Sequence, residues 1–378
     1  MVRAVRDGRF GPVLRSLALF WGAVTAAAVV LGAVLQVLGP LRPGAIAHAP
    51  APPDAAKAAA SVSSPAADHA AGAHSEDAHA PAPPAAAPTA PIHQATAEPP
   101  RRVVVPEPGA PVAAPDPLLL EASPSFQGLQ LPRIGPGDLR PSQVYAAGRA
   151  ALETRPRIAV LMADIGANAQ ASEEAIRGLP APVSFAIAPY GLRAPGLLDM
   201  ARARGHEVFA VVPMEPSSYP LNDPGPNALL TGSAPAVNAR NLEWALSRFN
   251  GYVGVTAVLG RMHGERYANA PELHAVMLEE LGRRGLIYLD PRPGGGAPPS
   301  SRLPPFRAVD LVVDAPAVRS EVDERLGQLE RRARENGTAI GLAEGPTPMV
   351  IDRIAAWATS LPVRGFALVP VSALIVPP

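Results

Sequence analysis

The stretch RIAVLMADIG, residues 157–166, decides the fold of this chain. From Ile158 to Ala163 its residues are all apolar rather than alternating, which is typical of a strand buried on both faces of a parallel sheet. Asp164 and Gly166 follow, as expected where such a strand passes into a loop. Runs of the same kind recur at residues 183–189, 207–213, 253–260, 286–290, 309–314, 338–344 and 366–371.

Amphipathic helix patterns lie between most of these runs. They cover residues 171–178, 194–204, 237–249, 271–284, 318–336 and 349–359. The alternation over residues 155–378 predicts an α/β domain, either a barrel or a doubly wound sheet. In both architectures the functional site lies at the carboxyl ends of the strands. The candidates at these ends are Asp164, residues 211–215, residues 256–261, Asp290 and Glu344.

The amino-terminal part predicts a membrane anchor. Residues 17–38 carry no charge and would span roughly 33 Å as a helix, enough for the hydrocarbon core of a bilayer. Four arginines lie in the preceding segment 1–16, so the positive-inside rule predicts a single-pass protein of the inner membrane with its carboxyl-terminal domain in the periplasm. The alternative is a cleaved signal peptide, with small residues at 45–47 as the cleavage site.

Residues 39–154 have a different composition, rich in proline and alanine, which predicts a disordered linker. Within it, residues 117–134 contain enough leucine to pack on the domain as a short arm. The 33 basic and 33 acidic residues balance, so the chain has no global basic field and we expect no nucleic-acid partner. The absence of cysteine excludes disulfides and thiol chemistry, and the one lysine, Lys57, lies in the linker.

Several motifs occur in an order that resembles a known family. They are residues 158–166, 179–186, 205–208, 213–216, 222–226, 229–232, 251–254, 289–290 and 337–340. Together they resemble the divergent polysaccharide deacetylases, a bacterial envelope-associated branch of the polysaccharide deacetylase superfamily, over residues 155–375. The resemblance implies an α/β fold with a distorted (β/α) barrel of about seven parallel strands. In this chain the transmembrane helix and the linker would precede it.

The resemblance also implies metal-assisted removal of an acetyl group, with one aspartate as base and an aspartate and two histidines around a divalent ion. This chain departs from that pattern. Ala163 stands at the base position, and Val211, Val258 and Glu344 stand where histidines are expected. Valine cannot bind a metal and alanine cannot accept a proton. We therefore expect no metal cofactor and a catalytically impaired protein.

The remaining polar residues predict ligand binding in the cleft that serves as the active site in the family that the chain resembles. Asp164 and Asp290 are predicted to be remnants of the catalytic set, and Glu215, Glu344 and Tyr219 to bind a polysaccharide or peptidoglycan-type glycan. Two alternatives stay open: an active deacetylase with a rearranged carboxylate site for Mg²⁺ or Ca²⁺, and a non-enzymatic scaffold for envelope assembly. The domain histidines His206, His263 and His274 match none of the family's ligands, and we interpret them as structural.

Overall fold

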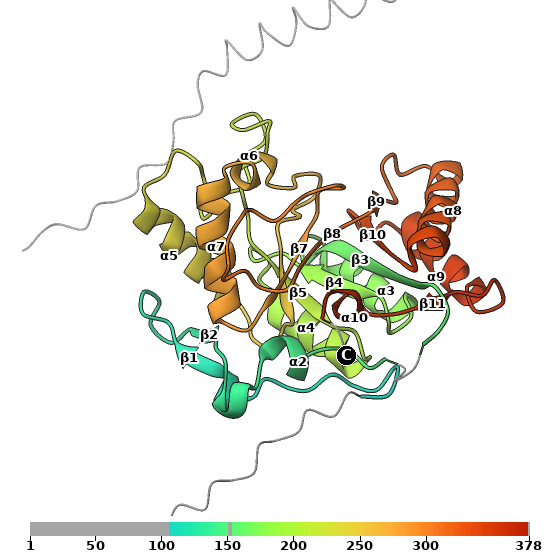
Figure 1. The fold of residues 1–378 in the computed structure, drawn as a ribbon, viewed down its shortest axis with the longest axis horizontal. Coiled ribbons are helices and arrows are strands. Elements are labelled where there is room, and N and C mark those ends of the chain that lie inside the picture. Colours follow the sequence, from blue (N-terminus) through green and yellow to red (C-terminus); the bar gives the residue numbers. More distant parts are fainter. Residues whose placement is uncertain (1–105, 150–152, 377–378) are drawn as a thin grey trace, which may run out of the picture. The chain divides into compact units, whose positions relative to one another are not determined.

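A computed structural model describes residues 106–149 and 153–376 (Figure 1). The predicted basic segment 1–16, the predicted anchor 17–38 and the linker up to residue 105 lie outside the described residues. Within the described ranges no helix is both long and apolar enough to cross a membrane.

Parallel strands curled into a half-barrel form the centre of the domain (Figure 1). Their order is β8-β7-β6-β5-β4-β3-β10-β9, and β11 pairs with the first part of β3. They are β3 (Arg157–Ile165), β4 (Ser184–Ile187), β5 (Val208–Val211), β6 (Gly254–Thr256), β7 (Ile287–Asp290), β8 (Phe306–Ala308), β9 (Leu311–Val312), β10 (Thr338–Ala343) and β11 (Ala367–Leu368).

The two ends of this order show how the half-barrel compares with the distorted barrel of about seven strands that the resemblance implies. β8 and β9 do not pair with each other, but only Val309 and Asp310 separate them in the sequence. The Val309 amide donates to the Asp290 carbonyl at the end of β7, and the Asp310 amide donates to the Ile340 carbonyl of β10. The segment from β8 to β9 therefore contacts β7 at one end and β10 at the other. It connects the two edges of the half-barrel without a regular ladder of hydrogen bonds between β8 and β9.

The six predicted helices are present and end within one turn of their predicted limits. They are α3 (Ala169–Gly178), α4 (Ala194–Ala203), α5 (Pro235–Leu246), α7 (Pro271–Arg283), α8 (Arg319–Asn336) and α9 (Pro348–Ser360). Asn168 and Thr347 cap α3 and α9 through their side chains, and proline begins α5, α7 and α9. The one-turn helices α2 (Pro141–Val144), α6 (Glu265–Ala268) and α10 (Ser372–Ile375) are too short to give a periodic pattern.

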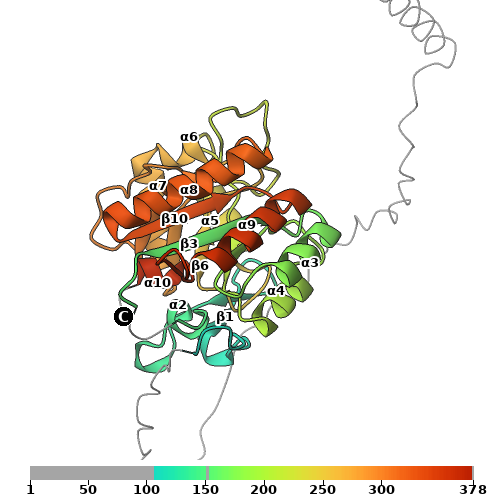
Figure 2. The same ribbon diagram turned by 90° about the vertical axis from the view of Figure 1, so that its right-hand side faces the viewer.

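Two apolar cores lie on the two faces of the sheet. The outer core lies between the strands and the helices, and Figure 2 shows α8 and α9 along the outside of β10 and β3, with α3 and α4 beside them. The inner core fills the curl of the sheet with side chains such as Leu161, Phe209, Ile287 and Leu342. Because both faces are covered, the strands are apolar throughout, as the sequence predicts.

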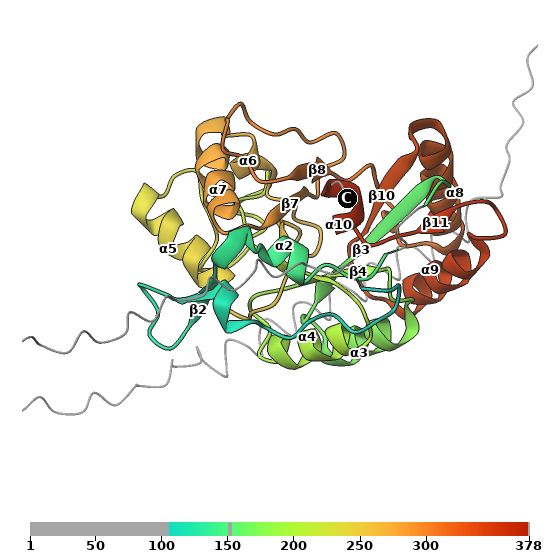
Figure 3. The same cartoon turned by 60° about the horizontal axis from the view of Figure 1, so that its bottom comes forward.

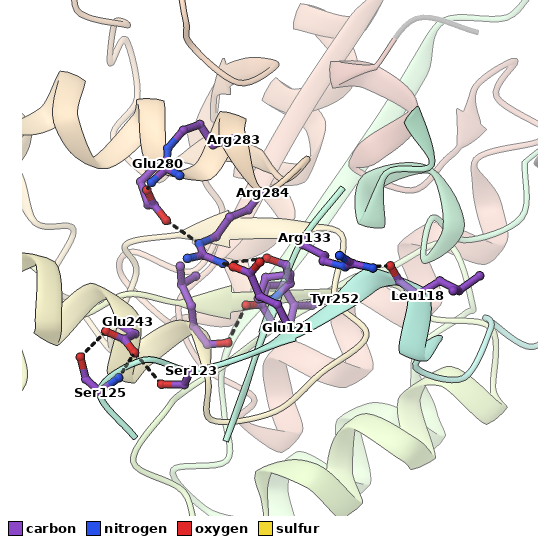
Figure 4. Close-up of polar contacts among 12 residues, drawn as sticks. Leu118, Glu121, Ser123, Ser125, Arg133, Glu243, Tyr252, Glu280, Arg283 and Arg284 are labelled. Atoms are coloured by element: carbon purple, nitrogen blue, oxygen red, sulfur yellow. Dashed lines mark hydrogen bonds and ion pairs between the residues drawn. The ribbon is translucent and has the colours of Figure 1, made fainter. Parts of the chain in front are cut away.

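The segment before Arg155 belongs to the folded part. Its elements η1 (Pro117–Leu119), β1 (Leu120–Ala122), β2 (Gln130–Pro132) and η2 (Pro136–Asp138) precede α2, and β1 and β2 form an antiparallel hairpin. Glu243 of α5 accepts hydrogen bonds from Ser123 and Ser125, and Arg284 donates to the Pro132 carbonyl at 2.9 Å (Figure 4). The predicted short arm is therefore present and is held by α5 and by the residue that follows α7.

A buried carboxylate, Glu207, connects the segment that follows α2 with the start of α10, and Figure 3 shows these two helices. Glu207 is 1% exposed and accepts hydrogen bonds from the Ser184 hydroxyl, the Ala147 amide, and the amide and hydroxyl of Ser372. Burial raises the pKa of this carboxyl, and the hydrogen bonds from Ser372 and Ser184 offset only part of the effect. Glu207 thus connects β4, the amino-terminal segment and α10 at one point.

Candidate functional site

The candidate site begins with Asp164 at the carboxyl end of β3. Its backbone is left-handed, with φ of 59°, which is uncommon for a residue other than glycine and marks positions that the surrounding structure holds in place. The side chain borders a cavity of about 470 Å³ between the loops that follow β3, β4 and β6. Burial raises the pKa of the Asp164 carboxyl, and the backbone of Gly260 partly offsets that effect.

The other walls of the cavity come from residues 188–193 and from Leu259. Tyr190 lies with its ring centroid 5.1 Å from that of Trp244, and its hydroxyl accepts a hydrogen bond from the Asn227 amide. A Cβ atom at position 191 would lie 2.8 Å from the Gly166 carbonyl oxygen, so glycine is needed where these two loops meet. The cavity is therefore open at a rim of small residues and bounded by one aromatic ring.

A histidine–carboxylate pair lies in the loops after β6 and β10. The His263 Nε2 atom is 2.9 Å from Glu344 Oε1, without the alignment of a directed hydrogen bond, and Arg261 Nε is 3.8 Å from Glu344 Oε2. The Glu344 amide donates to Asp314, which follows β9. His263 is structural by the prediction from sequence, but it lies here within reach of a carboxylate. Its place in a loop at the carboxyl end of a predicted strand was a signal that could have made it a candidate.

Asp290 is engaged by a neighbour in the sequence. Its side chain is fully buried, and Arg292 donates to both of its oxygens, at 2.9 Å from Nε to Oδ1 and 2.6 Å from Nη2 to Oδ2. The Arg292 amide adds a third hydrogen bond to Oδ1. The carboxylate that the sequence placed in the cleft is thus satisfied by groups of the protein itself.

Glu215 is satisfied in the same way. It accepts hydrogen bonds from the amide and hydroxyl of Thr231, and Arg266 donates to its other oxygen at 2.9 Å. Burial acts to raise the pKa of Glu215, but the hydrogen bonds from Thr231 and Arg266 outweigh it and leave the pKa below its usual value. Tyr219 lies half-buried four residues further along the same loop.

The positions that the resemblance assigns to the catalytic base and to the metal ligands do not fit a metal ion. Ala163, at the base position, and Val211 and Val258, at two histidine positions, are each 0% exposed and form part of the inner core. Among the residues that the structure describes, no three Asp, Glu or His side chains are grouped so that they could hold a metal ion. Asp164 and Glu344 remain as oxygen donors but do not make a complete donor set, and we derive no metal-dependent step.

Two further histidines are held away from the cavity. His206 contacts the carbonyls of Val183 and Ile176, at 2.9 and 3.3 Å, and so joins β4 to the last turn of α3. His274 is fully buried in α7 beside Tyr288, and neither of its ring nitrogens has a hydrogen-bond partner among the described residues. Both positions agree with a structural interpretation.

The buried His274 predicts a pH effect on stability. Burial lowers its pKa from 6.5 to about 4, although Asp290 acts in the opposite direction. The unfolded chain therefore binds the proton more readily, and acidification from pH 7 to pH 5 should cost about 2 kcal/mol through this residue. Urea unfolding at both pH values, on the wild type and on His274→Met, measures it. An equal pH dependence in both proteins would contradict the prediction.

The comparisons with known proteins agree with this geometry. The profile of the divergent polysaccharide deacetylase family matches residues 160–375. No curated protein matches the chain. The crystal structure of an uncharacterized protein from Agrobacterium tumefaciens C58 is 32% identical, with a TM-score of 0.59, over 65% of this chain and 100% of that one. A proposed polysaccharide deacetylase from Mycobacterium smegmatis is 14% identical, with a TM-score of 0.40, over 61% of this chain and 92% of that one.

The family match starts within β3 and ends with α10, so it includes every parallel strand of the half-barrel. It also includes Asp164, the cavity beside it and the His263–Glu344 pair. More than half of the chain is covered, and the motifs occur in the family's order. The chain belongs to the divergent polysaccharide deacetylase family.

Proposed function

We propose that this protein binds an envelope glycan in the cavity beside Asp164 and does not deacetylate it. The observation that carries the proposal is the combination of a retained cavity with a lost metal site. The cavity of about 470 Å³ is of the size of small-molecule sites and lies at the strand ends where this architecture places its function. Val211 and Val258 meanwhile pack in the core.

The cavity suits a saccharide. Asp164 offers a carboxylate that can accept hydrogen bonds from hydroxyl groups, and Tyr190 offers a ring beside it. Glu344 and His263 lie in neighbouring loops and extend the polar surface. Asp290 and Glu215 contribute through the loops that they hold, since their own oxygens are occupied by Arg292 and Arg266.

The proposal includes a place in the cell. Residues 17–38 would anchor the chain in the inner membrane, and the domain would face the periplasm and its glycans. Protein that sediments with membranes, with a domain that external protease reaches in spheroplasts, is the expected result. Release of a soluble protein after export would instead indicate cleavage near residues 45–47.

The full-length protein in detergent should bind oligosaccharides of the bacterial wall without releasing acetate. Titration calorimetry with peptidoglycan fragments and with chitooligosaccharides measures binding, and an acetate assay on the same mixtures measures turnover. We expect Asp164→Ala to weaken binding about tenfold or more, as the loss of one charge-assisted contact does. The exposed Asp352→Ala is the matched control. Absence of binding to every glycan would contradict the proposal.

One observation favours a second candidate function, a hydrolase with a rearranged site. His263 and Glu344 lie 2.9 Å apart, as a base and its orienting carboxylate do. Acetate release that is lost in His263→Ala but kept in the control would support this candidate and would show that the protein turns its ligand over.

A further inference from the structure

The cavity beside Asp164 has few polar side chains. Ten residues line it, and only Asp164, Tyr190 and Arg193 among them are polar. The remaining lining residues are Gly166, Ala167, Ala169, Ala188, Gly191, Leu192 and Leu259. Small side chains leave room for a ligand, and the one carboxylate sets the charge that such a ligand meets.

Asp164 differs from the other candidate carboxylates because it has no cation of its own. Arg292 lies 2.6 Å from Asp290, Arg266 lies 2.9 Å from Glu215, and His263 lies 2.9 Å from Glu344. Across residues 106–149 and 153–376, no arginine or histidine forms an ion pair with Asp164. Asp164 receives a backbone contact from Gly260 but no opposite charge, and a ligand that supplies a positive charge would offset part of the cost of burying this carboxylate.

Arg193 does not fill this role, although it lines the cavity. Its guanidinium contacts Glu173 of α3 at 2.9 Å, and Glu173 also pairs with Arg177. Arg193 is therefore held by a carboxylate outside the cavity and not by Asp164. Asp164 remains the carboxylate of the cavity without an ion-pair partner among the described residues.

The walls of the cavity favour a ligand that has a ring next to the group that contacts Asp164. Tyr190 is held by Trp244 at 5.1 Å and is 37% exposed, so its ring is fixed while part of it stays open to solvent. Leu192 is 95% exposed at the same rim. An aromatic ring attracts both apolar ring faces and cations.

We propose that the cavity selects an amino sugar whose amine is free and protonated, in preference to the N-acetylated sugar. The ammonium group would donate to Asp164 and the sugar ring would lie along Tyr190. An acetamide is neutral at that position and cannot supply the charge that Asp164 lacks. This inference rests on the proposed glycan-binding function and specifies the chemical class of its ligand.

The test compares two oligomers of equal length, glucosamine and N-acetylglucosamine, on the full-length protein in detergent. At pH 6 and low salt the glucosamine oligomer should bind about tenfold more tightly or better, and added salt should reduce the difference. Asp164→Asn should abolish the preference, whereas Asp352→Asn, which removes the same charge from an exposed position on α9, should keep it. Unchanged melting temperatures show that both variants are folded.

The possible failures can be told apart. Binding of the acetylated oligomer that equals or exceeds that of the free amine overturns this inference and leaves glycan binding intact. If Asp164→Asn still prefers the glucosamine oligomer, this inference is also overturned, because another residue must then recognise the amine. Binding of neither oligomer, nor of any other wall glycan, overturns the proposed function itself.

Discussion

Replacing Glu207 by alanine is expected to lower the free energy of unfolding by about 4 kcal/mol. Four hydrogen bonds reach this carboxylate, from Ser184, Ala147 and two groups of Ser372. All of the donors are buried, and each would lose its acceptor where water cannot replace it. Chemical denaturation monitored by circular dichroism measures the loss.

Two variants make this result specific. Glu335→Ala removes the same side chain at an exposed position of α8 and should change stability by less than about 0.5 kcal/mol. Glu207→Gln keeps an acceptor and should lose less than the alanine variant. Because burial raises the pKa of Glu207 above its unfolded value, the wild type should lose stability as the pH rises through the folded pKa, and the glutamine variant should not. A small loss of stability in Glu207→Ala would contradict the role of Glu207 in connecting β4, the amino-terminal segment and α10.

Asp290→Ala is expected to cost about 3–5 kcal/mol, because it leaves the half-buried Arg292 without its carboxylate. The pair is bidentate, and Arg292 also donates to Asn269 at 2.6 Å, so the guanidinium is fixed in place. Thermal and urea unfolding measure the effect, with Asp352→Ala as the exposed control. Removing both partners should cost less than the sum of the single changes.

This prediction separates two roles for Asp290. From its sequence position Asp290 is predicted to be a remnant of the catalytic set, whereas in the structure Arg292 donates hydrogen bonds to both of its oxygens. A stable Asp290→Ala protein with weakened glycan binding would support recognition. An unstable protein with normal binding in its folded fraction would support the structural role.

The fold was largely predictable because its elements are strongly patterned. β3 is a continuous apolar run, and the six longer helices show clear amphipathic periodicity. The bridge at Val309 and Asp310 was not predictable. The sequence predicts a single strand over residues 309–314, whereas the structure has two strands of three and two residues, β8 and β9, on either side of this pair, and such short strands give no pattern of their own. The arm at residues 117–134 lies within a segment of linker-like composition, and its contacts with Glu243 and Arg284 show that it is folded.

The candidate site was predictable only in part. Asp164 could be placed because it follows a strand. The pairing of His263 with Glu344 could not be predicted, because the two residues are far apart in the sequence and their loops meet only in the folded chain. The Asp290–Arg292 pair is local in the sequence. Whether an arginine two residues away contacts a carboxylate depends on how deeply both side chains are buried, which the sequence alone does not give.

The contacts of Glu207 and β11 have a consequence for how the domain opens. Ser372 supplies two of the four hydrogen bonds to Glu207, and β11 covers the first part of β3, so residues 367–372 complete a sheet whose central strand lies much earlier in the sequence. Detachment of this segment alone would uncover a buried carboxylate and an open strand edge. We therefore expect residues 367–372 to exchange their amide hydrogens together with β3 and β4, as part of one cooperative unit, and not as a separately fraying segment.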